Sequence, residues 1–173
     1  MYAGEELDRL VATCRDKFPR HDDPVVGYDE KCSPAQLAEV ESLLDVALPA
    51  SHKRLLVERG PFYIAVPDYY WGHILYSPEQ IVTYTLRSRE VYNRDYFSDT
   101  DHELSRILNS LVFFQFVDDD REEDYYGLLC DGSPTTTVHR LKHDDVPALI
   151  DTVASDFDSH IKSLVDQIIA SLP

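Results

Sequence analysis

The chain has 173 residues, 43% of them hydrophobic, and its 32 acidic residues outnumber its 16 basic residues to give a net charge of −16. This length fits one domain, and the hydrophobic share is too high for an intrinsically disordered chain. The charge excludes a general binder of nucleic acids or anionic membranes, because both roles need a surplus of Lys and Arg. Either the acids serve solubility alone, or the protein has a basic partner.

The cysteines and the N-terminal residues indicate where the protein resides. Cys14, Cys32 and Cys130 lie far apart and form no CxxC pair, so we expect reduced, mostly buried thiols and neither a disulfide framework nor a zinc knuckle. The first residues are acidic, whereas a signal peptide begins with bases and continues with an apolar run. No stretch approaches the roughly 18 consecutive apolar residues of a membrane span. The expected location is therefore the cytoplasm.

The first third of the chain is predicted to be helical. Apolar residues at helical spacing predict a helix over residues 4–18, and residues 19–32 are expected to form a polar connector. The Ser-Pro-Ala-Gln sequence from Ser33 supplies an N-cap, a proline in the first turn and a capping-box glutamine. A short third helix follows Pro49 and ends at Gly60. The apolar face of the second helix is expected to consist of Leu37, Val40, Leu43 and Leu44.

Strand patterns begin after the third helix. Residues 62–67 and 73–76 are rich in aromatic and β-branched types, which predicts two strands. A second Ser-Pro-x-Gln start at Ser77 opens a helix that extends through Tyr92. A short helix is expected over residues 103–109.

The rest of the chain predicts a meander of strands and a closing helix. The most hydrophobic run, residues 111–117, fits a strand buried on both faces, and residues 118–124 are expected to form a charged turn. Further strands are predicted over residues 125–130 and 136–141, and Ser155 is expected to cap a final helix. The fold class is therefore α+β, with a mainly antiparallel sheet on which N-terminal and C-terminal helices pack.

Seven segments, in this order and at this spacing, carry a resemblance to a known family: residues 33–41, 47–49, 52–60, 74–81, 116–131, 137–145 and 154–158. They resemble the SUKH superfamily (the Smi/Knr-type domain), with its E-x-E helix, the Leu-Pro that starts the next helix, and paired strands joined by an acidic turn. Arg59 departs from the pattern, because the family often has Asn there. The resemblance implies a SUKH-like domain over residues 33–173, preceded by an N-terminal helical extension, residues 1–32.

The resemblance implies a function in binding and no enzymatic activity. Many bacterial members look like immunity proteins that neutralise a polymorphic or contact-dependent toxin. The chain would then bind a cognate toxin domain stoichiometrically, with a basic toxin such as a nuclease as the partner, and without cofactor, nucleic acid or membrane. The alternative is a regulatory scaffold like the fungal Smi/Knr-type proteins, which are linked to cell-wall synthesis and have no toxin partner.

The acids are concentrated in one part of the chain. Residues 90–131 contain 12 acids and 3 bases, so −9 of the net charge lies in less than a quarter of the chain. The core of this region is a poor calcium loop, because it lacks a central glycine and has Leu129 where a bidentate Glu is needed. It is either a solvated turn or a docking patch that attracts a basic partner. In the second interpretation, the partner-binding residues are Asp118, Asp119, Asp120, Glu122, Glu123 and Asp124.

Two aromatic residues are added to this predicted interface. Tyr69 and Trp71 lie in a concentrated aromatic stretch that contains the only tryptophan of the chain. Tyr and Trp are common interface anchors because they bury a large area at little cost in rotamer freedom. The competing interpretation is a ring cluster packed on the sheet.

No catalytic or metal site is predicted. His139 and His143 have a spacing that suits a metal on a helix, but His139 falls in a predicted strand. The chain has no GxSxG elbow, no phosphate-binding glycine loop and no HExxH motif. A metal-dependent enzyme is therefore the third and least favoured interpretation.

Overall fold

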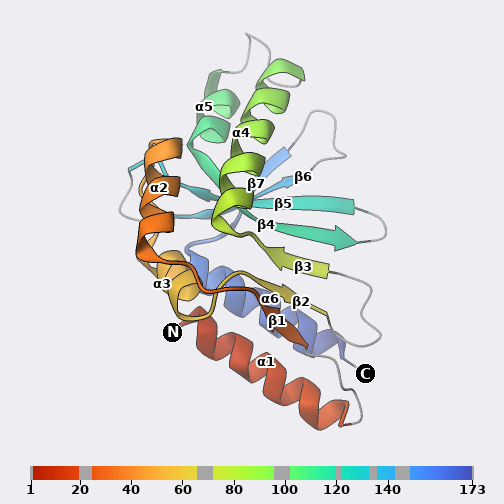
Figure 1. Ribbon diagram of the computed structural model, residues 1–173. Coiled ribbons are helices and arrows are strands. Elements are labelled where there is room, and N and C mark those ends of the chain that lie inside the picture. Colours follow the sequence, from red (N-terminus) through yellow and green to blue (C-terminus); the bar gives the residue numbers. More distant parts are fainter. Residues whose placement is uncertain are drawn as a thin grey trace.

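The computed structural model describes residues 2–19, 25–65, 72–95, 102–119, 122–132, 136–142 and 149–172. In this part of the chain, one seven-stranded antiparallel sheet has the order β1-β2-β3-β4-β5-β6-β7 (Figure 1). Each strand therefore pairs with its neighbours in sequence. The strands are β1 (Val26–Tyr28), β2 (Phe62–Ile64), β3 (Gly72–Leu75), β4 (Leu111–Asp119), β5 (Glu122–Leu129), β6 (Val138–Lys142) and β7 (Leu149–Ala154).

Helices cover both faces of the sheet. On one face, Phe114 of β4 contacts Phe157 of α6, with ring centroids 5.5 Å apart. On the other face, the backbone N–H of Phe113 donates a hydrogen bond of 3.0 Å to the Thr85 hydroxyl of α4. The predicted α+β class, with an antiparallel sheet and helices at both ends, is confirmed. The helices are α1 (Ala3–Lys17), α2 (Pro34–Leu44), α3 (Ala50–Glu58), α4 (Pro78–Asp95), α5 (His102–Ser110) and α6 (Phe157–Ser171).

The two edge strands were not predicted. β1 forms within the expected polar connector of residues 19–32, and β7 forms where no element is expected. Each of them pairs on one side only, β1 with β2 and β7 with β6. Edge strands are half exposed and often short, so they lack the continuous apolar pattern that identifies an inner strand.

The predicted cap of α6 is also wrong. The N-cap is Asp156 and not Ser155, because the Asp156 carboxylate accepts a 2.7 Å hydrogen bond from the backbone N–H of Ser159. This bond satisfies one of the free donors of the first helical turn.

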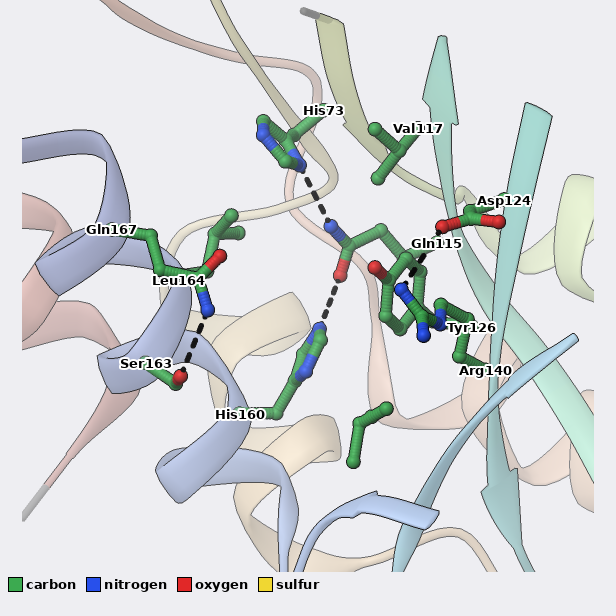
Figure 2. A pocket seen from close by; sticks show the side chains of 11 residues that line it. His73, Gln115, Val117, Asp124, Tyr126, Arg140, His160, Ser163, Leu164 and Gln167 are labelled. Atoms are coloured by element: carbon green, nitrogen blue, oxygen red, sulfur yellow. Dashed lines mark hydrogen bonds and ion pairs between the residues drawn. The ribbon is translucent and has the colours of Figure 1, made fainter. Parts of the chain in front are cut away.

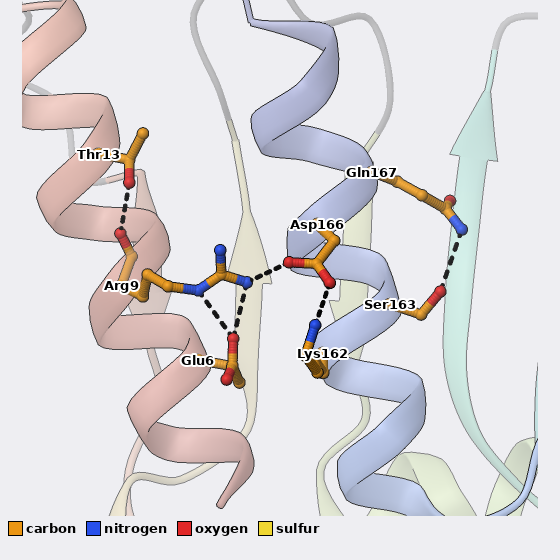
Figure 3. A network of polar contacts seen from close by, with 7 residues as sticks. All are labelled: Glu6, Arg9, Thr13, Lys162, Ser163, Asp166 and Gln167. Carbon is orange, nitrogen blue, oxygen red and sulfur yellow. Dashed lines mark hydrogen bonds and ion pairs between the residues drawn. The ribbon is translucent and has the colours of Figure 1, made fainter. Parts of the chain in front are cut away.

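The N-terminal helix packs along the C-terminal helix. The backbone N–H of Ala3 donates to Asp158 over 2.9 Å, and Arg9 donates to Asp166 over 2.5 Å. Asp166 also bonds Lys162, one turn earlier on α6 (Figure 3). α1 therefore packs on α6, and β1, which also precedes residue 33, joins the sheet. The proposed division between residues 1–32 and 33–173 stays a prediction.

One residue of the predicted core is on the surface. Leu37, Val40 and Leu44 are buried as expected, but Leu43 is 59% exposed. Buried positions that recur every three or four residues form one stripe of a helix, and Leu43 lies beside that stripe.

The three cysteines of the chain are thiols, as expected. Cys14 and Cys32 are buried, Cys130 is half-buried, and all three are free. Burial raises the pKa of Cys130 to about 12.

None of the helices within the described ranges has the length and apolar character needed to cross a membrane.

Gly60, which follows α3, is expected to tolerate no side chain. Its φ is +95°, and a Cβ atom there would lie 2.6 Å from the backbone oxygen of Asp29. Gly132 is a matched control, because its φ of +82° is similar but a Cβ atom would meet no described residue within 4 Å. We expect Gly60→Ala to lower the free energy of unfolding by about 3 kcal/mol and Gly132→Ala by about 1 kcal/mol. Urea denaturation measures both, and equal losses would show that the close contact costs nothing.

Candidate functional site

The acidic segment forms the end of a β-hairpin. β4 and β5 stay paired to their tips, with Asp119 opposite Glu122 and Asp118 opposite Glu123. The expected turn over residues 118–124 is therefore too long, because only residues 120 and 121 separate the two strands. We call Asp118, Asp119, Glu122, Glu123 and Asp124 the acidic hairpin end.

This pairing is unfavourable for the hairpin itself. Two acidic residues stand at directly opposite register positions, and then two more. Like charges at such positions destabilise an antiparallel pair, by roughly 0.2–1 kcal/mol for each pair. The backbone pairing nevertheless continues through these positions to Asp119 and Glu122.

Asp124 has a cation nearby. Its side chain is 13% exposed, and its carboxylate lies 3.6 Å from the Arg140 guanidinium. The same guanidinium lies 3.7 Å from the Asp151 carboxylate. Arg140 of β6 thus connects β5 with β7. Sequence reasoning missed Arg140 and Asp151, because their proximity depends on the strand register and on β7.

Asp124 and Arg140 line a cleft between the sheet and α6 (Figure 2). Its volume is about 470 Å³. Most of the lining is polar. The lining side chains are His73, Gln115, Val117, Asp124, Tyr126, Arg140, Val153, His160, Ser163, Leu164 and Gln167.

Two histidines of this lining are linked through a buried glutamine (Figure 2). Gln115 Nε2 lies 3.3 Å from His73 Nδ1, and Gln115 Oε1 lies 2.8 Å from His160 Nε2. With the amide in this orientation, Gln115 donates to His73 and accepts from His160. Burial lowers the pKa of His73 to about 4 and that of His160 to about 3, so both rings are neutral at pH 7.

This chain of hydrogen bonds has a structural role. His73, Gln115 and His160 are 4%, 2% and 7% exposed, so a substrate has little access to them. A general base must come within hydrogen-bond reach of the proton that it removes. The three side chains instead join β3, β4 and α6 in the core.

Of the two suggested metal ligands, His139 is the one that lies in the part of the chain that the structure describes. His139 lies between two hydroxyls, with Thr137 Oγ1 2.8 Å from Nε2 and Thr152 Oγ1 3.4 Å from Nδ1. No cluster of three His, Cys, Asp or Glu side chains is found among the described residues. His143 lies outside them.

Three of the predicted partner-binding residues also lie outside the described ranges: Tyr69, Trp71 and Asp120. The structure therefore brings five of the eight predicted residues together in the backbone, at the acidic hairpin end. Asp124 also lines the cleft.

Comparison with known proteins supports a family for this chain. The family model of the SMI1 / KNR4 family (SUKH-1) matches residues 31–163, which is more than half of the chain. The matched range includes the hairpin and the first turns of α6, and it begins after α1 and β1. No curated protein matches the chain.

Proposed function

Because the chain belongs to the SMI1 / KNR4 family (SUKH-1), we propose that it is a non-catalytic binding protein that acts as an immunity protein. It binds a cognate polymorphic or contact-dependent toxin in a stoichiometric complex in the cytoplasm and blocks that toxin. The family is consistent with such a role, and the charge of the chain favours a basic partner.

The observation that carries this proposal is the acidic hairpin end. Opposed acids weaken the hairpin in the free protein, and a basic partner that neutralises them removes this repulsion. The relief of this repulsion therefore adds to the free energy of binding. Proteins commonly accept such local conflicts where a site must bind something. A nuclease surface that holds phosphates has the complementary charge.

The cleft extends this surface. Asp124 belongs to the acidic hairpin end and lines the cleft. A partner that covers the hairpin end therefore also reaches the mouth of the cleft, where Ser163 and Gln167 of α6 are exposed. The proposed interface consists of the hairpin end, this mouth, and Tyr69 and Trp71.

Charge reversal at the hairpin end tests the proposal. We expect Asp119→Lys with Glu122→Lys to slow association with the toxin domain encoded next to the gene by roughly tenfold or more at low salt. The reason is that steering depends on the charge at the contact surface. The matched control is Glu5→Lys with Glu30→Lys, which changes the net charge equally at exposed positions elsewhere. Stopped-flow fluorescence at several salt concentrations measures the rates.

The outcomes separate the alternatives. Equal association rates for the hairpin and control variants, both folded by circular dichroism, would mean that the acidic segment is only a solvated hairpin end. Failure of the unmodified protein to bind the neighbouring toxin domain would favour the regulatory scaffold of the Smi/Knr type.

A further inference from the structure

A groove runs between α2 and α4, away from the acidic hairpin end. Its volume is about 290 Å³. From α2 it is lined by Glu39, Val40 and Leu43, and from α4 by Glu79, Val82 and Thr83. Gln36 of α2 and Pro78 of α4 complete the lining, and we call this site the α2–α4 groove.

The groove follows the axes of both helices. The α2 residues that line it, from Gln36 to Leu43, span two helical turns, or about 10 Å at 1.5 Å per residue. The α4 residues from Pro78 to Thr83 span more than one turn. Two adjacent helices that leave such a groove can receive a third helix by packing ridges into grooves.

The two helices that form the groove each carry an exposed leucine. Leu43 is 59% exposed and Leu86 is 49% exposed, the two highest values among large hydrophobic side chains in the described ranges. Leu86 follows Val82 by one turn of α4, so it continues the same face. Single exposed apolar residues are ordinary, but Leu43 lines the groove together with Val82, and Leu86 lies one turn beyond Val82.

The two charged side chains that line the groove are both acidic. Glu39 and Glu79 are exposed and line the groove, one from each helix. Among its described lining residues there is no lysine or arginine. An occupant with apolar side chains and flanking bases is therefore complementary to it.

We propose that the α2–α4 groove binds an amphipathic helix of a second protein, with apolar side chains against Leu43 and Val82 and lysine or arginine beside Glu39 and Glu79. This site is distinct from the proposed toxin interface. The hairpin end lies at the end of β4, whereas α4 contacts the beginning of β4 through Phe113 and Leu111. The groove can thus be occupied while the hairpin end binds its own partner.

A synthetic peptide tests the site on the full chain. The probe is a helical peptide of leucine and lysine with leucines at positions i, i+3, i+4 and i+7, and its control has the same composition in shuffled order. We expect the striped peptide to bind, and Leu43→Ser to weaken binding by roughly tenfold or more, because an apolar contact is lost. Glu39→Lys with Glu79→Lys should weaken it similarly by repulsion. Fluorescence anisotropy at 0.15 M salt measures the dissociation constants.

The hairpin variant, Asp119→Lys with Glu122→Lys, is the matched control, since it changes the net charge equally at the other surface. It should bind the peptide almost as the unmodified protein does. Equal affinity for the shuffled peptide, or unchanged affinity in Leu43→Ser, would overturn the proposal. A dimer in sedimentation that Leu43→Ser dissociates would overturn it as well, because the occupant would be a second copy. None of these outcomes depends on whether the chain binds a toxin.

Discussion

Lowering the pH from 8 to 5 is expected to remove about 2 kcal/mol of stability for each of three buried histidines. Burial lowers the pKa of His52 to about 3, of His73 to about 4 and of His160 to about 3. The unfolded chain takes up protons below pH 6.5, whereas the folded chain keeps these rings neutral. Their stabilisation is therefore complete above pH 6.5 and is lost as the pH falls toward 4 and 3. Together they account for about 6 kcal/mol, which is comparable with the whole stability of many domains.

His52 allows this effect to be isolated. Its ring is fully buried between Phe114 and Phe157, with centroids 5.7 Å and 5.0 Å away, and neither ring nitrogen has a hydrogen-bond partner among the described residues. His52→Leu should raise the free energy of unfolding at pH 8 by about 1–2 kcal/mol, because two unpaired polar atoms leave the core. It should also reduce the loss between pH 8 and pH 5 by about 2 kcal/mol. Urea denaturation at both pH values measures the loss for the variant and for the unmodified protein. The other titratable groups contribute equally to both proteins, so their effects cancel when the two losses are compared. An unchanged loss would show that the fold does not lower the pKa of His52.

Gln115→Leu is expected to lower the free energy of unfolding at pH 8 by about 3 kcal/mol, although it makes the core more apolar. Gln115 bonds His73 and His160 simultaneously, so its removal leaves a buried polar atom on each ring without a partner. Each such atom costs about 1–3 kcal/mol. Urea denaturation measures the loss.

His52→Leu is the matched control for this second prediction. Both variants replace a fully buried polar side chain by leucine, and the expected signs are opposite. Only Gln115 connects other polar groups. A loss of stability in both variants would mean that leucine does not fit these sites, and a gain in both would mean that the His73–Gln115–His160 chain contributes nothing.

The helices could be predicted because their signals are local. The hydroxyls of Ser33 and Ser77 each accept a hydrogen bond from the backbone N–H three residues on, and the glutamine side chain there accepts one from the backbone N–H of the serine. Both capping boxes are visible as four consecutive residues. Leu43 shows the limit of such patterns, because an apolar residue next to a buried stripe cannot be assigned a neighbour from spacing alone.

The site was predictable in part. Its acids are consecutive in sequence, so their clustering needs no structure. The position of Asp124 beside Arg140 depends on the register of β5 and β6, and that of Asp151 depends on an edge strand without a clear pattern. The cleft arises from the packing of α6 on the sheet, between residues far apart in sequence, and no local signal reports it.

The pairing of α1 with α6 has a consequence for how the protein is made. Ala3 and Asp158, which are hydrogen-bonded, are 155 residues apart in the chain. At 5–20 residues per second, a ribosome needs roughly 8–30 s to synthesise the chain between these two residues. The sheet can assemble meanwhile from hairpins between consecutive strands, but Leu7 and Leu10 of α1 have no α6 to cover them. During this interval the newborn chain exposes an apolar helix face, so its folding is completed only after α6 has left the ribosome.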